Sequence, residues 1–187
     1  MMLQFKKIWM VFTFGICFNL ACTKKADTAT TITATPGILT LSSTAFTNNG
    51  RLPILYTCDG SSVSPPIAWT DASAGTMSYA VTMHHVPAPG EKHVYWVLYN
   101  IPNTVTGLLV NNSGVGNFGI NTVNGKQSYS PPCSQGPGDK QYTLTVYALS
   151  AAPKFSVSAS TISMDLLLDA IKTTTLATGT MNVVYAR

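Results

Sequence analysis

This sequence is poor in charged residues. Its 187 residues include 11 Lys and Arg and 7 Asp and Glu, which together make up 10% of the chain. The few cations are scattered and form no basic stripe interleaved with aromatic residues, so nucleic acid is not an expected partner. Low charge combined with many Thr, Ser and Asn residues is typical of an exported β-protein.

Signatures of common enzymes are also missing. The sequence contains no Gly-x-Ser-x-Gly motif, and its few acidic residues offer no obvious partner for His93, so no hydrolase triad is predicted. Gly114, Gly116 and Gly119 have the spacing of a dinucleotide-binding loop, but this segment neither follows a hydrophobic strand nor opens a helix. We therefore expect no catalytic residues, no cofactor and no enzymatic activity.

The N-terminal apolar run is too short to span a bilayer comfortably. It extends from Ile8 to Ala21 and follows Lys6 and Lys7, a pattern that predicts an export signal over residues 1–21. A small residue stands directly before Cys22, which is similar to the bacterial lipobox and predicts lipidation of this cysteine. The alternative is an ordinary secretory signal in which Cys22 is incidental.

Residues 22–37 are predicted to be a flexible tether, because they are polar and rich in Thr and Ala and have no apolar periodicity. Residues 38–187 then form one domain, since their number suits a single hydrophobic core. Acyl chains on Cys22 would attach the protein to a membrane on the periplasmic side of a bacterial cell envelope. A secreted, soluble protein is the alternative.

Cysteine is scarce, and its four copies have separate predicted fates. Cys17 leaves with the export signal, and Cys22 is the lipidation candidate. Cys58 and Cys133 remain as a pair in an oxidising compartment, where a disulfide is predicted. Two buried free thiols are the alternative.

Short apolar or alternating segments separated by turn signals predict a mainly β domain. The expected strands are Leu39–Leu41, Leu52–Tyr56, Ile67–Trp69, Tyr79–Met83, Tyr95–Tyr99, Tyr142–Leu149 and Met181–Tyr185. One helix is predicted from Ser163 to Thr173, with Ser163 as its N-cap. Its expected buried face consists of Leu166, Leu167, Ala170 and Ile171. The long connection between Pro102 and Tyr142 has little periodicity and is expected to be functional.

All three histidines lie within ten residues, at positions 84, 85 and 93. A Pro/Gly loop between two predicted strands can bring them to one end of a sheet, where a ligand pocket is expected. Neighbouring strand residues point to opposite faces, so at most one of His84 and His85 converges with His93 unless the loop bends the chain there. A copper or zinc site formed by these imidazoles is a second hypothesis.

Six short sequence motifs follow one another between Cys58 and Leu149. They are Cys58-Asp59-Gly60, Ser64-Pro65-Pro66-Ile67-Ala68-Trp69, Pro87-Ala88-Pro89, Trp96 to Pro102, Tyr129 to Gly138 and Tyr142 to Leu149. Together they resemble the phosphatidylethanolamine-binding protein (PEBP) family, in its bacterial Raf-kinase-inhibitor-like branch. The resemblance covers about residues 38–187 and implies a large Greek-key β-sheet domain with a few peripheral helices.

The resemblance also implies a small pocket that binds anionic groups such as the phosphate of a phospholipid head group. Here His85 and Pro87 stand where the family's wall motif has two aspartates, and Tyr95 and Lys140 stand where it has histidines. The residues assigned to this pocket are His84, His85, Pro87, His93, Tyr95, Tyr129, Pro131, Pro132, Lys140 and Tyr142.

The substituted pocket remains suited to anions. Lys140 brings a full cation, and Tyr95 and Tyr142 bring hydroxyl donors, while the loss of two acids raises the positive potential. The predicted function is a non-enzymatic binding protein whose pocket takes a small anionic or phosphate-bearing ligand. The alternative is a pocket that no longer works, on a domain that serves as an interaction or inhibitor module for a protein partner.

Overall fold

The computed structural model describes residues 36–187. The predicted export signal, Cys22 and nearly all of the predicted tether lie outside the described residues. None of the helices in the described part is long and apolar enough to cross a membrane.

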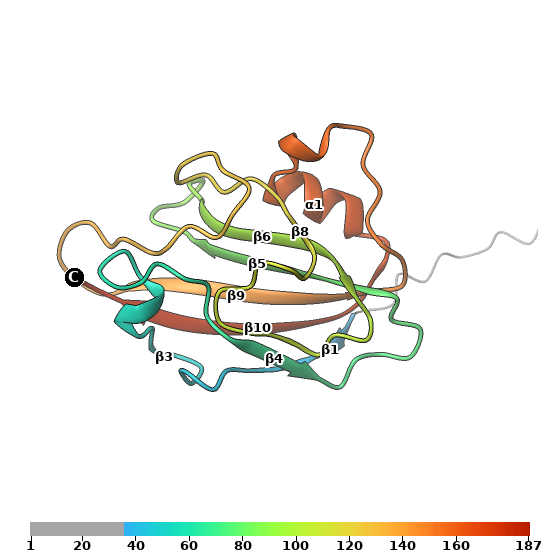
Figure 1. The fold of residues 1–187 in the computed structure, drawn as a ribbon, viewed down its shortest axis with the longest axis horizontal. Helices are drawn as coiled ribbons and strands as arrows, with labels where there is room; N and C mark the ends of the chain where they lie inside the picture. The colour runs from blue at the N-terminus through green and yellow to red at the C-terminus, as the bar shows by residue number, and fades with distance from the viewer. Residues whose placement is uncertain (1–35) are drawn as a thin grey trace, which may run out of the picture. The chain divides into compact units, whose positions relative to one another are not determined.

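The main sheet has seven strands, and four long ones form its centre (Figure 1). In order across the sheet, the central strands are β10 (Thr175–Tyr185), β9 (Lys140–Leu149), β5 (Ser78–His85) and β6 (His93–Pro102), and all neighbours are antiparallel. The short strands β1 (Gly37–Ile38) and β3 (Gly50–Arg51) pair in parallel with β10, and β8 (Asn117–Phe118) pairs with β6. Aromatic and β-branched residues dominate the central strands, as their β-propensity requires.

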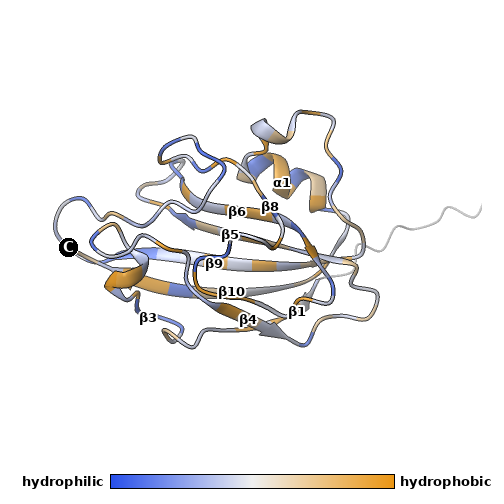
Figure 2. Cartoon of the chain, viewed as in Figure 1, coloured by the Kyte–Doolittle hydropathy of each residue, from blue (hydrophilic) through white to orange (hydrophobic). Residues whose placement is uncertain are grey.

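A second, small sheet packs on one face of the main sheet. Its strands are β2 (Thr40–Ser42), β4 (Ile67–Thr70) and β7 (Gly107–Leu108), in the order β2-β4-β7. The main hydrophobic core lies between the two sheets, where the rings of Trp69 and Tyr79 approach to 5.1 Å between centroids. Figure 2 shows apolar residues along β4, whereas the loop that leads into β9 is hydrophilic.

The one α-helix of the described residues, α1 (Met164–Ile171), covers the other face of the main sheet. The predicted cap is confirmed, because the Ser163 hydroxyl accepts a hydrogen bond from the backbone N–H of Leu166 at 3.2 Å. The predicted face is partly wrong, since Leu166 is 42% exposed and the buried residues are Met164, Leu167 and Ile171. The 3₁₀ turn η2 (Ala159–Thr161) precedes this helix.

The predicted strand at Leu52–Tyr56 is wrong. Its second half is the 3₁₀ helix η1 (Ile54–Tyr56), which follows Pro53. Proline has no N–H to donate to a sheet, and its fixed φ suits the start of a helical turn. The other six predicted strands coincide at least in part with observed ones.

The connection between β6 and β9 contains the two short strands β7 and β8, which the sequence did not predict. At two positions of this connection the structure favours glycine over other residues. Gly116 has a φ of +75°, and a Cβ at Gly119 would lie 2.6 Å from the Val97 side chain. These glycines therefore allow the connection to run close against the main sheet.

Candidate functional site

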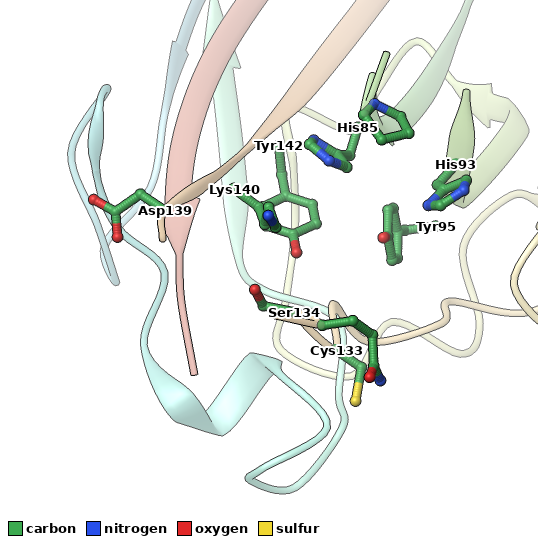
Figure 3. Close-up of a pocket in the computed structure, with 10 residues that line it drawn as sticks. His85, His93, Tyr95, Cys133, Ser134, Asp139, Lys140 and Tyr142 are labelled. Carbon is green, nitrogen blue, oxygen red and sulfur yellow. The ribbon is translucent and has the colours of Figure 1, made fainter. Parts of the chain in front are cut away.

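A pocket of about 410 Å³ opens at one end of the main sheet (Figure 3). Because β5 is antiparallel to both β6 and β9, its last residues meet the first residues of these two strands at this end. The loop before β9 closes the other side. The lining residues are His85, Pro87, His93, Tyr95, Cys133, Ser134, Gln135, Asp139, Lys140 and Tyr142.

Two buried tyrosines form the inner wall of the pocket. The rings of Tyr95 and Tyr142 meet edge to face with centroids 5.2 Å apart. Burial raises the pKa of each hydroxyl above its ordinary value. Both tyrosines are therefore neutral at physiological pH, and each hydroxyl can donate a hydrogen bond to an anion.

His85 and His93 face each other across β5 and β6, with ring centroids 6.3 Å apart. The Nδ1 atom of His85 lies 2.7 Å from the backbone oxygen of Gln141, so Nδ1 carries a proton and donates it. This bond fixes the ring and leaves Nε2 to accept a hydrogen bond from a ligand, or to donate one when the ring is charged.

His84, which was also assigned to the site, does not line this pocket. Strand alternation directs its side chain to the opposite face of β5 from His85. There it is half-buried, and this burial, with the nearby positive charge of Lys92, lowers the pKa of its ring.

Tyr129, Pro131 and Pro132 were also assigned to the pocket, and they do not line it either. The hydroxyl of Tyr129 donates to the backbone oxygen of Tyr56 at 2.6 Å. The backbone oxygen of Pro132 accepts from the N–H of Cys58 at 3.0 Å. These two hydrogen bonds hold the loop that contains Tyr129 and Pro132 against the segment from Tyr56 to Cys58.

The predicted disulfide between Cys58 and Cys133 is confirmed, with 5.2 Å between the two Cα atoms. Cys133 lies in the pocket wall, and Cys58 follows η1 by two residues. The bridge therefore ties the pocket loop to a segment that is distant in sequence.

Ser134, Gln135, Asp139 and the wall position of Cys133 were not predicted. Ser134 is the most informative of them, because it is only 3% exposed and its Oγ has no hydrogen-bond partner within residues 36–187. In Figure 3 this hydroxyl lies on the side of the pocket that holds Lys140 and Tyr142. Serine is common in this sequence, and only its place next to Cys133 distinguishes Ser134.

The pocket contains one cation without a partner. Lys140 makes no ion pair within the described part of the chain, whereas the carboxylate of Asp139 is paired with Arg51 at 3.3 Å and points away (Figure 3). Asp59, the nearest acid on the Cys58 side of the bridge, is held by Arg187 at 2.5 Å and by the Tyr185 hydroxyl. The Arg187 guanidinium lowers the pKa of this carboxyl, with a smaller contribution from Tyr185.

Residues 36–187 contain no group of three or more His, Cys, Asp or Glu side chains placed to hold a metal ion. His85 and His93 would supply two imidazoles only. The ammonium and the hydroxyls of the pocket are hydrogen-bond donors, and such donors are suited to an anion.

Comparison with known proteins agrees with this architecture. The family described as Phosphatidylethanolamine-binding protein matches residues 42–186. A UPF0098 protein of Aquifex aeolicus is 36% identical over 119 residues, which cover 60% of this chain and 69% of that protein. The Mycobacterium tuberculosis protein named "Putative lipoprotein LppC" is 28% identical over 131 residues, or 68% of this chain and 65% of its own.

A solved structure shows the same fold. The crystal structure of Escherichia coli YbcL, described as a member of the mammalian PEBP family, superimposes with a TM-score of 0.71 at 26% identity. The match covers 80% of this chain and 98% of YbcL. The family match over most of the chain and the agreement of the fold establish that this chain belongs to the phosphatidylethanolamine-binding protein family.

Proposed function

We propose that this chain is a non-enzymatic binding protein whose pocket takes a small anionic or phosphate-bearing group. The observation that carries the proposal is that one pocket is lined both by Lys140, which has no ion-pair partner within residues 36–187, and by Ser134, whose buried hydroxyl has no hydrogen-bond partner there. A buried hydroxyl without a partner costs about 1–3 kcal/mol, so a ligand that reached it would gain by supplying the missing bond.

The charges around the pocket favour an anion over a cation. Asp139, which lines the pocket, and Asp59, which follows Cys58 directly, are both paired with arginines. The ammonium of Lys140 and the neutral hydroxyls of Tyr95 and Tyr142 then remain to bind negative oxygens. Hydrogen bonds from such groups to a charged acceptor are the stronger kind.

The size of the pocket limits the ligand. A volume of about 410 Å³ lies in the range of small-molecule sites, which is about 300–1,000 Å³. It accommodates a phosphate, a carboxylate or a head group of a larger molecule.

Isothermal titration of the purified protein with inorganic phosphate tests the proposal. We expect millimolar or tighter binding, and a loss of at least tenfold in affinity for Lys140→Ala because the full cation is removed. Lys154→Ala is the matched control, since Lys154 is exposed, makes no ion pair within residues 36–187 and lies outside the pocket. Equal affinities for wild type and Lys140→Ala, or no binding of phosphate at all, would contradict the proposal.

We further propose that the protein is exported and attached to a membrane of the bacterial cell envelope through lipid on Cys22. The support comes from the short apolar run before Cys22 and from the name of its relative LppC. The pocket would then be held near a membrane surface, on the periplasmic side.

A further inference from the structure

A second hollow of about 310 Å³ continues from the pocket on the side of β6. The two hollows share His93, Tyr95, Cys133 and Gln135. The second hollow adds Thr122 and Val123, from the connection between β8 and β9. A ligand held in the first pocket can therefore extend across Tyr95 into the second.

The two hollows differ in charge. Asp139 and Lys140 line the first one only, and among residues 36–187 no Lys, Arg, Asp or Glu lines the second. The hydroxyl of Thr122 is engaged, because it accepts the backbone N–H of Val94 at 2.8 Å. Val123, which is 48% exposed, offers an apolar wall with a free surface.

The wall of the second hollow is rigidly held. The side-chain oxygen of Asn121 accepts the backbone N–H groups of Val123 at 3.0 Å and Asn124 at 2.9 Å. Its amide donates to the backbone oxygen of Lys126 at 2.9 Å. Asn121 is fully buried, so the turn that carries Val123 is formed before any ligand arrives.

We propose that the ligand has two parts, an anionic group beside Lys140 and an uncharged apolar arm against Val123 and the ring of Tyr95. This inference rests on the proposed function and assigns the second hollow to the same ligand. Apolar surface gains from burial there, whereas a charged arm would lose its hydration without finding a partner.

Titration with three phosphates tests the inference on the purified protein. Phenyl phosphate carries an apolar arm, phosphoethanolamine a charged arm and inorganic phosphate none. We expect phenyl phosphate to bind at least tenfold more tightly than inorganic phosphate, which corresponds to burial of about 55 Å² of apolar surface at about 25 cal/mol per Å². Phosphoethanolamine is expected to bind no more tightly than inorganic phosphate.

Substitutions of Val123 test whether the apolar arm of the ligand binds in the second hollow. Val123→Asp should reduce the affinity ratio of phenyl phosphate to inorganic phosphate to threefold or less, and Val123→Asn should lower the ratio without introducing a charge. Both ligands carry the anionic group, so the ratio of their affinities cancels any repulsion between that group and the new carboxylate. Val157→Asp is the matched control, because Val157 is 46% exposed and lies by α1, outside both hollows.

The outcomes separate the two proposals. Equal binding of phenyl phosphate and inorganic phosphate would overturn the two-part ligand and leave the anion pocket in place. A ratio that survives both Val123 substitutions, or phosphoethanolamine as the tightest ligand, would also overturn it. If none of the three phosphates bound, the proposed function and this inference would both be wrong.

Discussion

At the scale of single residues, substitution of Ser134 is expected to have different effects on stability and on ligand binding. Its buried hydroxyl has no hydrogen-bond partner among residues 36–187, so Ser134→Ala removes an unsatisfied group. We expect the free energy of unfolding to stay unchanged or to rise by up to about 1 kcal/mol. Phosphate affinity should fall by about tenfold, since a hydrogen bond to a charged group contributes about 1.5–3 kcal/mol. Urea denaturation and isothermal titration measure the two effects.

Ser78 provides a matched control for this prediction. It is also 3% exposed, but its hydroxyl donates to the backbone oxygen of Ile101 at 3.1 Å, far from the pocket residues in the sheet. Ser78→Ala should therefore lower stability by about 1 kcal/mol and leave phosphate affinity unchanged. If Ser134→Ala behaved like Ser78→Ala, the role assigned to the Ser134 hydroxyl would be wrong.

At the scale of elements, the disulfide joins the pocket loop to the segment after η1. The bridge closes a loop of 75 residues, so the variant Cys58→Ala/Cys133→Ala should lose about 4 kcal/mol of stability in the chain-entropy model. Phosphate affinity should fall as well, because Ser134 follows Cys133 directly and loses its anchored position. Urea denaturation of the variant and of the oxidised wild type measures the loss.

A reductant distinguishes the bridge from the packing of the cysteine side chains. Dithiothreitol should lower the midpoint of wild-type unfolding and leave the double variant unaffected. An unchanged midpoint in reduced wild-type protein would show that the bridge contributes nothing to stability.

The same scale shows how far the sequence determines the structure. Long strands such as β5, β6 and β9 were predicted because their apolar residues recur over five or more positions. Two-residue strands such as β7 and β8 carry no periodic signal, and they form only because β4 and β6 offer an edge for pairing. Their position is a long-range property that no local window contains.

The residues of the candidate site also differ in how far the sequence predicts them. Tyr95 and Tyr142 begin predicted strands and His85 lies two residues after another, and the family resemblance assigned all three to the pocket. Ser134 and Gln135 lie in a loop whose course is set by distant contacts, among them the bond from the Ser130 N–H to the Tyr95 backbone oxygen at 2.8 Å. His85 lines the pocket and His84 does not, because proximity in sequence says nothing about the face of a strand on which a side chain lies.

At the scale of the whole molecule, the attachment to a membrane is the property that sequence alone predicts. If Cys22 is lipidated, labelled palmitate should enter the protein in a bacterial host, and the protein should stay in the membrane fraction after a wash in 1 M salt. Salt screens surface charge over about 3 Å at this concentration but does not release acyl chains. The low charge of the chain, 10% of its residues, also leaves little for electrostatic binding.

Cys22→Ser should abolish the label and release the protein from the membrane fraction, whereas Cys17→Ser, five residues earlier, should keep both properties. The contrast matters because both cysteines lie near the same apolar run, and only one directly follows a small residue at its end. Retention of the label in Cys22→Ser would assign the lipid to another residue. Loss of the label with continued membrane retention would show that attachment does not depend on the lipid.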